Sequence, residues 1–128
     1  MRVVICDDSA FVRELLRLSC EDLGHQIVGE VSDGEEAIEV VMKLRPDLVF
    51  MDLVLPKKNG IESAKEIFQV MPKIKIVACT SLEQELMSAT ALKSGFMAYL
   101  TKPFSKKDIE NLFMFFKQNR KEATGGRV

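Results

Sequence analysis

The chain alternates between short apolar runs and longer segments with helical periodicity, and this alternation limits the possible folds more than any other feature. Five apolar runs have the length of strands: Val3–Cys6, Ile27–Val31, Asp47–Met51, Ile74–Cys79 and Met97–Leu100. The first, third and fourth runs are almost continuously apolar. That pattern is typical of strands in a parallel sheet that is covered on both faces.

Apolar residues at helical spacing occupy the segment after each of these runs. The five stripes are Val12, Leu16 and Leu23; Ala37, Ile38, Val41 and Leu44; Ile61, Ala64, Ile67, Phe68 and Met71; Leu82, Leu86, Ala89 and Leu92 or Lys93; and Ile109, Leu112, Phe113 and Phe116. Ser9 can cap the first helix and Gly24 can end it. Strict alternation of strand and helix predicts an α/β fold, with a parallel sheet and right-handed crossovers.

Length and charge exclude several classes of protein. A chain of 128 residues predicts one domain, since domains average about 150 residues. A net charge of −1 argues against a nucleic-acid binder that works through overall positive charge. No apolar run approaches the roughly 18 residues of a membrane helix. Cys6, Cys20 and Cys79 have no motif spacing, which predicts reduced thiols in a cytoplasmic protein.

We expect the domain to span residues 1–120. Residues 121–128 contain two adjacent glycines and no periodicity, so we expect a flexible tail or the start of a linker there.

Polar side chains that can bind or react with a ligand follow or end four of the five predicted strands. Asp7 and Asp8 follow the first strand, Asp52 ends the third, Thr80 ends the fourth, and Lys102 follows the fifth. Ligands of an open parallel sheet bind outside the carboxyl ends of its strands. In one shared sheet, three carboxylates, a hydroxyl and an ammonium therefore converge on one rim.

Three neighbouring carboxylates need a counter-charge. At about 4 Å each pair of like charges costs on the order of 4 kcal/mol near a protein surface. Mg²⁺ prefers oxygen ligands, and together with Lys102 it would neutralise the three acids. Thr80 and Lys102 would then hold phosphoryl oxygens, and a carboxylate can itself form an aspartyl phosphate. The residues alone predict a metal-dependent acidic site that handles phosphate.

In their order along the chain, these residues resemble the response-regulator receiver domain. The resemblance covers residues 2 to about 120 and rests on Asp7-Asp8-Ser9, Asp52, Leu55-Pro56, Gly60, Thr80-Ser81 and Lys102-Pro103-Phe104. It implies a flavodoxin-like, doubly wound five-stranded parallel sheet flanked by five helices. The strand order 2-1-3-4-5 comes from the family and not from the sequence pattern. The stretch Asp7 to Arg13 is similar to receivers of chemotaxis systems.

The resemblance also implies roles for the acids. Asp52 would accept phosphate from a histidine kinase. Asp8, Asp52 and the backbone carbonyl of Val54 would bind Mg²⁺ directly, and Asp7 would act through water.

The remaining roles concern the response to phosphate. Thr80 and Lys102 would bind phosphoryl oxygens, with a cis bond between Lys102 and Pro103. Tyr99 would swing inward as Thr80 moves, which couples the site to the face of the fourth helix, fifth strand and fifth helix. Phosphorylation would thus act as a population shift between two packings of that face.

Met114 and Phe115 lie beside the apolar stripe of the last helix, so we expect partial exposure. They would contact a partner protein or a second copy, or be partly buried under the tail.

The implied protein is a binding module that catalyses only its own phosphorylation and dephosphorylation. Its partners would be a histidine kinase and a motor switch, adaptor or phosphatase, or a second copy. No direct contact with nucleic acid and no membrane insertion are expected.

Three alternatives remain open at this point. The chain can be a phosphorelay intermediate, or the receiver half of a regulator whose effector follows Val128. It can also be a phosphatase with an aspartate nucleophile, although such enzymes place Asp-x-Asp on the first strand and Val54 stands where the second acid would be.

Two features depart from the common family pattern. Val54 and Leu82 are apolar where relatives often carry polar residues beside the hydrolytic water, which predicts slow self-dephosphorylation. Phe96 follows Gly95 where alanine is usual, which predicts crowding before Tyr99.

Overall fold

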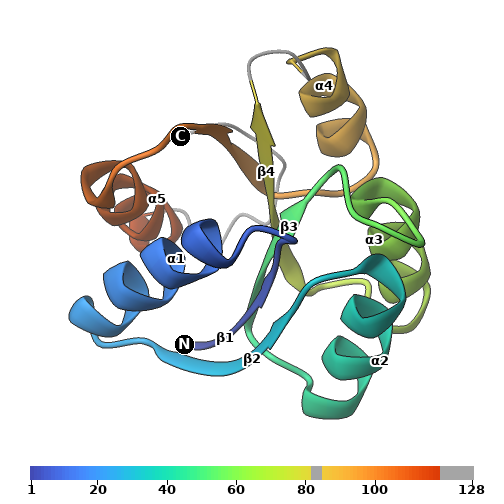
Figure 1. The fold of residues 1–128 in the computed structure, drawn as a ribbon, viewed down its shortest axis with the longest axis horizontal. Coiled ribbons are helices and arrows are strands. Elements are labelled where there is room, and N and C mark those ends of the chain that lie inside the picture. Colours follow the sequence, from blue (N-terminus) through green and yellow to red (C-terminus); the bar gives the residue numbers. More distant parts are fainter. Residues whose placement is uncertain (82–84, 119–128) are drawn as a thin grey trace.

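The computed structural model describes residues 1–81 and 85–118, and the predicted tail at 121–128 lies outside them. Five strands and five helices alternate along the described chain (Figure 1): β1 (Arg2–Cys6), α1 (Ala10–Asp22), β2 (Gln26–Val31), α2 (Gly34–Leu44), β3 (Leu48–Asp52), α3 (Gly60–Val70), β4 (Lys75–Ser81), α4 (Glu85–Lys93), β5 (Ala98–Lys102) and α5 (Lys106–Gln118). The strands form one parallel sheet in the order β2-β1-β3-β4-β5. The predicted fold class and strand order are confirmed.

The helices cover the two faces of the sheet in unequal groups. Figure 1 shows α1 and α5 on one side, and α2, α3 and α4 on the other. Successive strand residues point to opposite faces. On β3, for example, Val49 and Met51 pack toward α2, α3 and α4, while Leu48 and Phe50 pack toward α1 and α5. Both faces of the central strands are buried, which explains their nearly continuous apolar sequence.

Short polar side chains set the starts of three helices. The hydroxyl of Ser9 accepts from the amide of Val12, which confirms the predicted cap of α1. Asp33 and Asn59 cap α2 and α3 in the same way. Each side chain satisfies one of the amides that have no partner within the helix.

The predicted apolar stripe of the fourth helix is wrong. Leu86 is 90% exposed, and Ser88 and Ala91 are buried instead. Ala89 is exposed as well, and Leu82 lies outside the described residues. The residues between Glu85 and Lys93 are mostly small or polar, so few apolar positions distinguish one face of α4 from another.

The ring of Phe96 is fully buried and meets Phe68 edge to face at 6.2 Å. It is therefore part of the core on the side of α3 and α4.

The three cysteines are free and buried. Burial raises the pKa of the Cys20 thiol to about 12, with a smaller contribution from Glu21. Neutral buried thiols of this kind act as small apolar groups. No helix in the described part of the chain has the length and apolar character to cross a membrane.

Candidate functional site

Sheet register brings the predicted site residues to one rim. Cys6 pairs with Met51 across β1 and β3, so Asp7 and Asp52 follow as neighbours. Asp52 pairs with Cys79 on β4, one residue before Thr80. Three of the predicted strands end slightly later than expected, so Asp52, Thr80 and Lys102 all belong to strands.

Three carboxylates form a compact acidic cluster. Asp7, Asp8 and Asp52 each offer an oxygen, and these oxygens lie within 4.8 Å of one another. Asp7 and Asp52 are buried, and Asp8 is exposed. Oxygen donors at this spacing, with one open side, suit a hard divalent cation that keeps some of its waters. The residues present therefore fit Mg²⁺.

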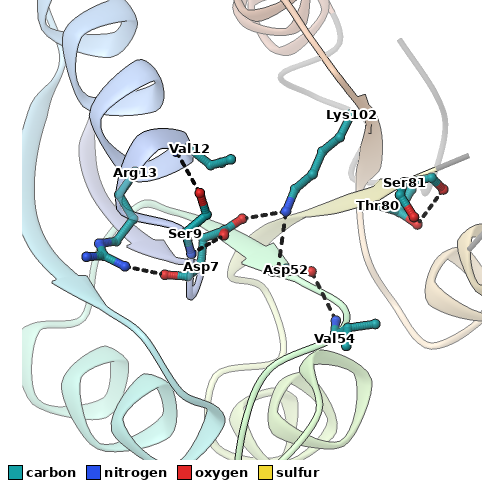
Figure 2. Close-up of polar contacts among 9 residues, drawn as sticks. All are labelled: Asp7, Ser9, Val12, Arg13, Asp52, Val54, Thr80, Ser81 and Lys102. Carbon is teal, nitrogen blue, oxygen red and sulfur yellow. Dashed lines mark hydrogen bonds and ion pairs between the residues drawn. The ribbon is translucent and has the colours of Figure 1, made fainter.

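Lys102 supplies the positive charge of the cluster (Figure 2). Its ammonium lies 2.9 Å from Oδ2 of Asp7 and 3.2 Å from Oδ2 of Asp52. Burial alone would lower the pKa of Lys102, but the two carboxylates outweigh that effect and raise it. The ammonium is therefore charged and partly compensates the two buried acids.

Asp52 stands in a less polar setting than an ordinary surface acid. Its pKa is raised, chiefly by burial and further by the charge of Asp7. The amide of Val54, which donates to Oδ1 of Asp52 at 3.0 Å, and the ammonium of Lys102 act in the opposite direction. The carboxylate thus has fixed donors, and Val54 itself is 48% exposed beside it.

Gly60 leaves room for the backbone of Asp52. Its amide donates to the carbonyl of Leu53 at 3.0 Å. A Cβ at this glycine would lie 2.1 Å from the carbonyl oxygen of Asp52. Only glycine allows α3 to start this close to the end of β3.

Thr80 lies at the same rim, directly after Cys79, the residue of β4 that pairs with Asp52. It is fully buried, and its hydroxyl donates to the carbonyl of Ser81 at 3.4 Å (Figure 2). The peptide bond between Lys102 and Pro103 is cis, as the resemblance implies.

The other residues with predicted roles, Tyr99, Met114 and Phe115, lie on β5 and α5. Tyr99 is half-buried and lines a cavity of about 310 Å³ with Leu100, Thr101, Phe104, Asp108 and Asn111. Met114 is 55% exposed, as predicted. Phe115 is half-buried, with its ring 5.9 Å from that of Phe116.

Two contacts that sequence reasoning missed support Asp7. The amide of Ser9 donates to Oδ1 of Asp7 at 2.9 Å, and Nη1 of Arg13 donates to the carbonyl of Asp7 at 2.7 Å. The first is a local turn that an aspartate two residues before a serine makes possible. No local signal in the sequence indicates the second.

The sequence matches the response regulator receiver domain family over residues 3–113. Chemotaxis protein CheY of Thermotoga maritima is 40% identical over 103 residues, which are 80% of this chain and 86% of that protein. Chemotaxis protein CheY of Halobacterium salinarum is 41% identical over 108 residues, 84% of this chain and 89% of that protein.

A solved structure agrees with these sequence relatives. The receiver domain of AraT, a response regulator from Geobacillus stearothermophilus, has a TM-score of 0.86 and 27% sequence identity. The match covers 94% of this chain and 95% of that one. The fold, the acidic cluster at the rim of the sheet and the sequence relatives all indicate the same family. The chain belongs to the family of response regulator receiver domains, the phosphorylation-activated modules of two-component signalling.

Proposed function

We propose that Asp52 accepts a phosphoryl group from the phosphohistidine of a histidine kinase, and that the phosphorylated domain binds a protein partner. The observation that carries this proposal is the cluster of Asp7, Asp8 and Asp52 with Lys102 bridging two of its members. The domain would comprise residues 1–120 of a cytoplasmic protein.

The transfer is a displacement at phosphorus. One carboxylate oxygen of Asp52 attacks the phosphorus, the bond to the histidine nitrogen breaks, and its electron pair returns to the imidazole, which takes up a proton. Lys102 lies within 3.2 Å of the attacking carboxylate and would pair with phosphoryl oxygens as they arrive. Thr80 would turn its hydroxyl from Ser81 toward the same oxygens.

Asp8, Asp52 and the carbonyl of Val54 would hold Mg²⁺ directly, and Asp7 would hold it through water. When bound, Mg²⁺ would offset negative charge on the acids and on the phosphoryl group. Lys102 would then shift from the carboxylates toward the phosphoryl oxygens. The domain thereby catalyses its own phosphorylation and dephosphorylation without processing a separate substrate.

We infer that the output is chemotaxis, with a motor switch, an adaptor or a phosphatase as the partner. The two CheY relatives support this choice. Thr80 and Tyr99 would transmit phosphorylation to the face of α4, β5 and α5, where Met114 offers exposed apolar surface.

Capture experiments with beryllofluoride and Mg²⁺, which mimic the phosphoryl group, test this output. A motor or adaptor protein retained only with the mimic is the expected result. Transfer of phosphate from Asp52 to a histidine of another protein would instead identify a relay intermediate. Dimerisation without capture of another protein would show that a second copy of the chain is the partner.

Loss of the charge on the exposed acid should weaken metal binding strongly. We expect Asp8→Asn to weaken Mg²⁺ affinity by about 100-fold, because a direct ligand loses its charge. Thr80→Ala should change the affinity by less than about threefold, since a hydroxyl that binds phosphoryl oxygens contributes little before phosphate arrives. Calorimetric titration measures both, and equal losses would contradict the assigned roles.

A polar residue beside Asp52 should shorten the life of the phosphorylated state. Val54 is apolar and about half exposed next to the proposed acceptor, so its side chain cannot orient water for hydrolysis. We expect Val54→Asn to speed dephosphorylation about tenfold. Decay of phosphoprotein after removal of the donor gives the rate, and a wild-type lifetime equal to or shorter than that of the variant would refute the interpretation.

A further inference from the structure

The peptide unit between Asp7 and Asp8 is held from outside the acidic cluster. The preceding peptide unit is anchored where the amide of Asp7 donates to the carbonyl of Val31 at 3.1 Å. The Asp7–Asp8 unit itself is held at the carbonyl of Asp7, which accepts from Nη1 of Arg13 at 2.7 Å. A peptide unit is planar. Orienting this carbonyl therefore also orients the amide and Cα of Asp8.

Asp8 depends on such backbone support more than its neighbours do. The carboxylates of Asp7 and Asp52 share the ammonium of Lys102 and are buried. Asp8 is exposed, and within residues 1–81 and 85–118 no side chain forms an ion pair or hydrogen bond with its carboxylate. Its position in the cluster follows from the backbone that carries it.

Arg13 makes this contact from the first turns of α1. Figure 2 shows its guanidinium on the opposite side of Asp7 from Lys102. Its Nε also lies 3.6 Å from Oε1 of Glu30 on β2. The side chain therefore connects the end of β1, the start of α1 and the neighbouring strand.

Arg17, one turn further along α1, provides a comparison. It pairs with Glu30 at 3.5 Å, as Arg13 does, and with two acids of its own helix, Glu14 and Glu21. No described contact joins Arg17 to Asp7. The contact with the carbonyl of Asp7 is thus what distinguishes Arg13 from another arginine on the same helix.

We propose that Arg13 is a positioning residue of the acidic site, whose guanidinium holds the Asp7–Asp8 peptide so that the Asp8 carboxylate stays within reach of a metal at Asp52. This inference rests on the proposed function of the site. A positioning role and a simple charge effect predict opposite changes in Mg²⁺ affinity when the guanidinium is removed. A nearby guanidinium repels Mg²⁺, so removal of its charge alone would tighten metal binding. Removal of a positioning contact weakens metal binding.

Calorimetric titration of the full chain with Mg²⁺ separates the two effects. Methionine keeps much of the aliphatic stem of arginine but lacks both charge and donors. We expect Arg13→Met to weaken Mg²⁺ affinity about tenfold, as loss of residues that orient metal ligands commonly does. Arg17→Met, which removes the same charge from the same helix, should leave the affinity unchanged or slightly tighter.

Arg13→Lys adds a second test. It restores the positive charge and a donor, so positioning predicts tighter Mg²⁺ binding than in Arg13→Met, whereas charge alone predicts weaker binding. In amide spectra of metal-free Arg13→Met, we expect the largest changes at Asp8 and Ser9.

Equal or tighter binding by Arg13→Met would overturn the proposal, and so would an equal loss in Arg17→Met, because general weakening of α1 would then explain both. If Arg13→Met does not fold, Arg13→Gln takes its place: it also lacks the charge, and its shorter side chain does not reach the carbonyl of Asp7 as the guanidinium does. Mg²⁺ affinity of Arg13→Gln equal to or tighter than that of the wild type would then overturn the proposal. Failure of the wild type to bind Mg²⁺ would contradict the proposed function of the site instead.

Discussion

Replacement of Asp52 by asparagine should reduce phosphoryl incorporation to background. The amide has the shape of the carboxylate but no anionic oxygen to attack phosphorus. Lys102 would keep its contact with Asp7, 2.9 Å away, so the rim would keep much of its structure. Incubation with a small phosphodonor and Mg²⁺, followed by intact-mass measurement, gives the incorporated phosphate directly.

Asp47→Asn is the matched control. Asp47 precedes the same strand at its opposite end, is exposed, and accepts from the amide of Arg2 at 2.7 Å. Incorporation should stay at the wild-type level in this variant. Full labelling of Asp52→Asn would show that another residue accepts the phosphate.

Replacement of Gly60 by alanine should destabilise the fold strongly. The new Cβ would lie 2.1 Å from the carbonyl oxygen of Asp52 and 2.9 Å from Cα of Leu53, so backbone atoms must move. We expect a loss of about 3 kcal/mol in the free energy of unfolding, at the upper end of overpacking costs. Urea unfolding measures this loss. Because the displaced atoms include the carbonyl of Asp52, phosphoryl incorporation should fall in molecules that remain folded.

Gly24→Ala separates crowding from backbone strain. Gly24 has a φ of +87°, and a Cβ there would meet nothing within 4 Å. This substitution should therefore cost about 1 kcal/mol through backbone strain alone. A cost for Gly60→Ala no larger than that for Gly24→Ala would contradict the close approach of α3 to β3.

The convergence of the site residues was predictable because each of them ends an apolar run. Parallel strands share one carboxyl end, so Asp7, Asp52, Thr80 and Lys102 meet wherever their strands share a sheet. The order of the strands was not predictable in this way, since the apolar pattern of a run does not indicate which other strands lie beside it in the sheet. That order came from the resemblance to the family.

The sequence pattern did not predict the contacts that side chains make across turns. Arg13 reaches back from α1 to the carbonyl of Asp7, a contact that depends on the direction of the helix and not on residue spacing alone. The exposed position of Leu86 was missed because α4 is rich in small and polar residues, so periodicity alone did not identify its buried face.

Chemical location of the phosphate tests most directly whether Asp52 is the phosphorylated residue and whether its phosphorylation requires a metal. Borohydride converts an aspartyl phosphate to homoserine, which peptide mass spectrometry identifies by position. After treatment with a small phosphodonor, homoserine should be found at position 52 with Mg²⁺ present and be absent when the metal is chelated. Homoserine at another aspartate, or equal conversion at position 52 without metal, would contradict metal-dependent phosphorylation of Asp52.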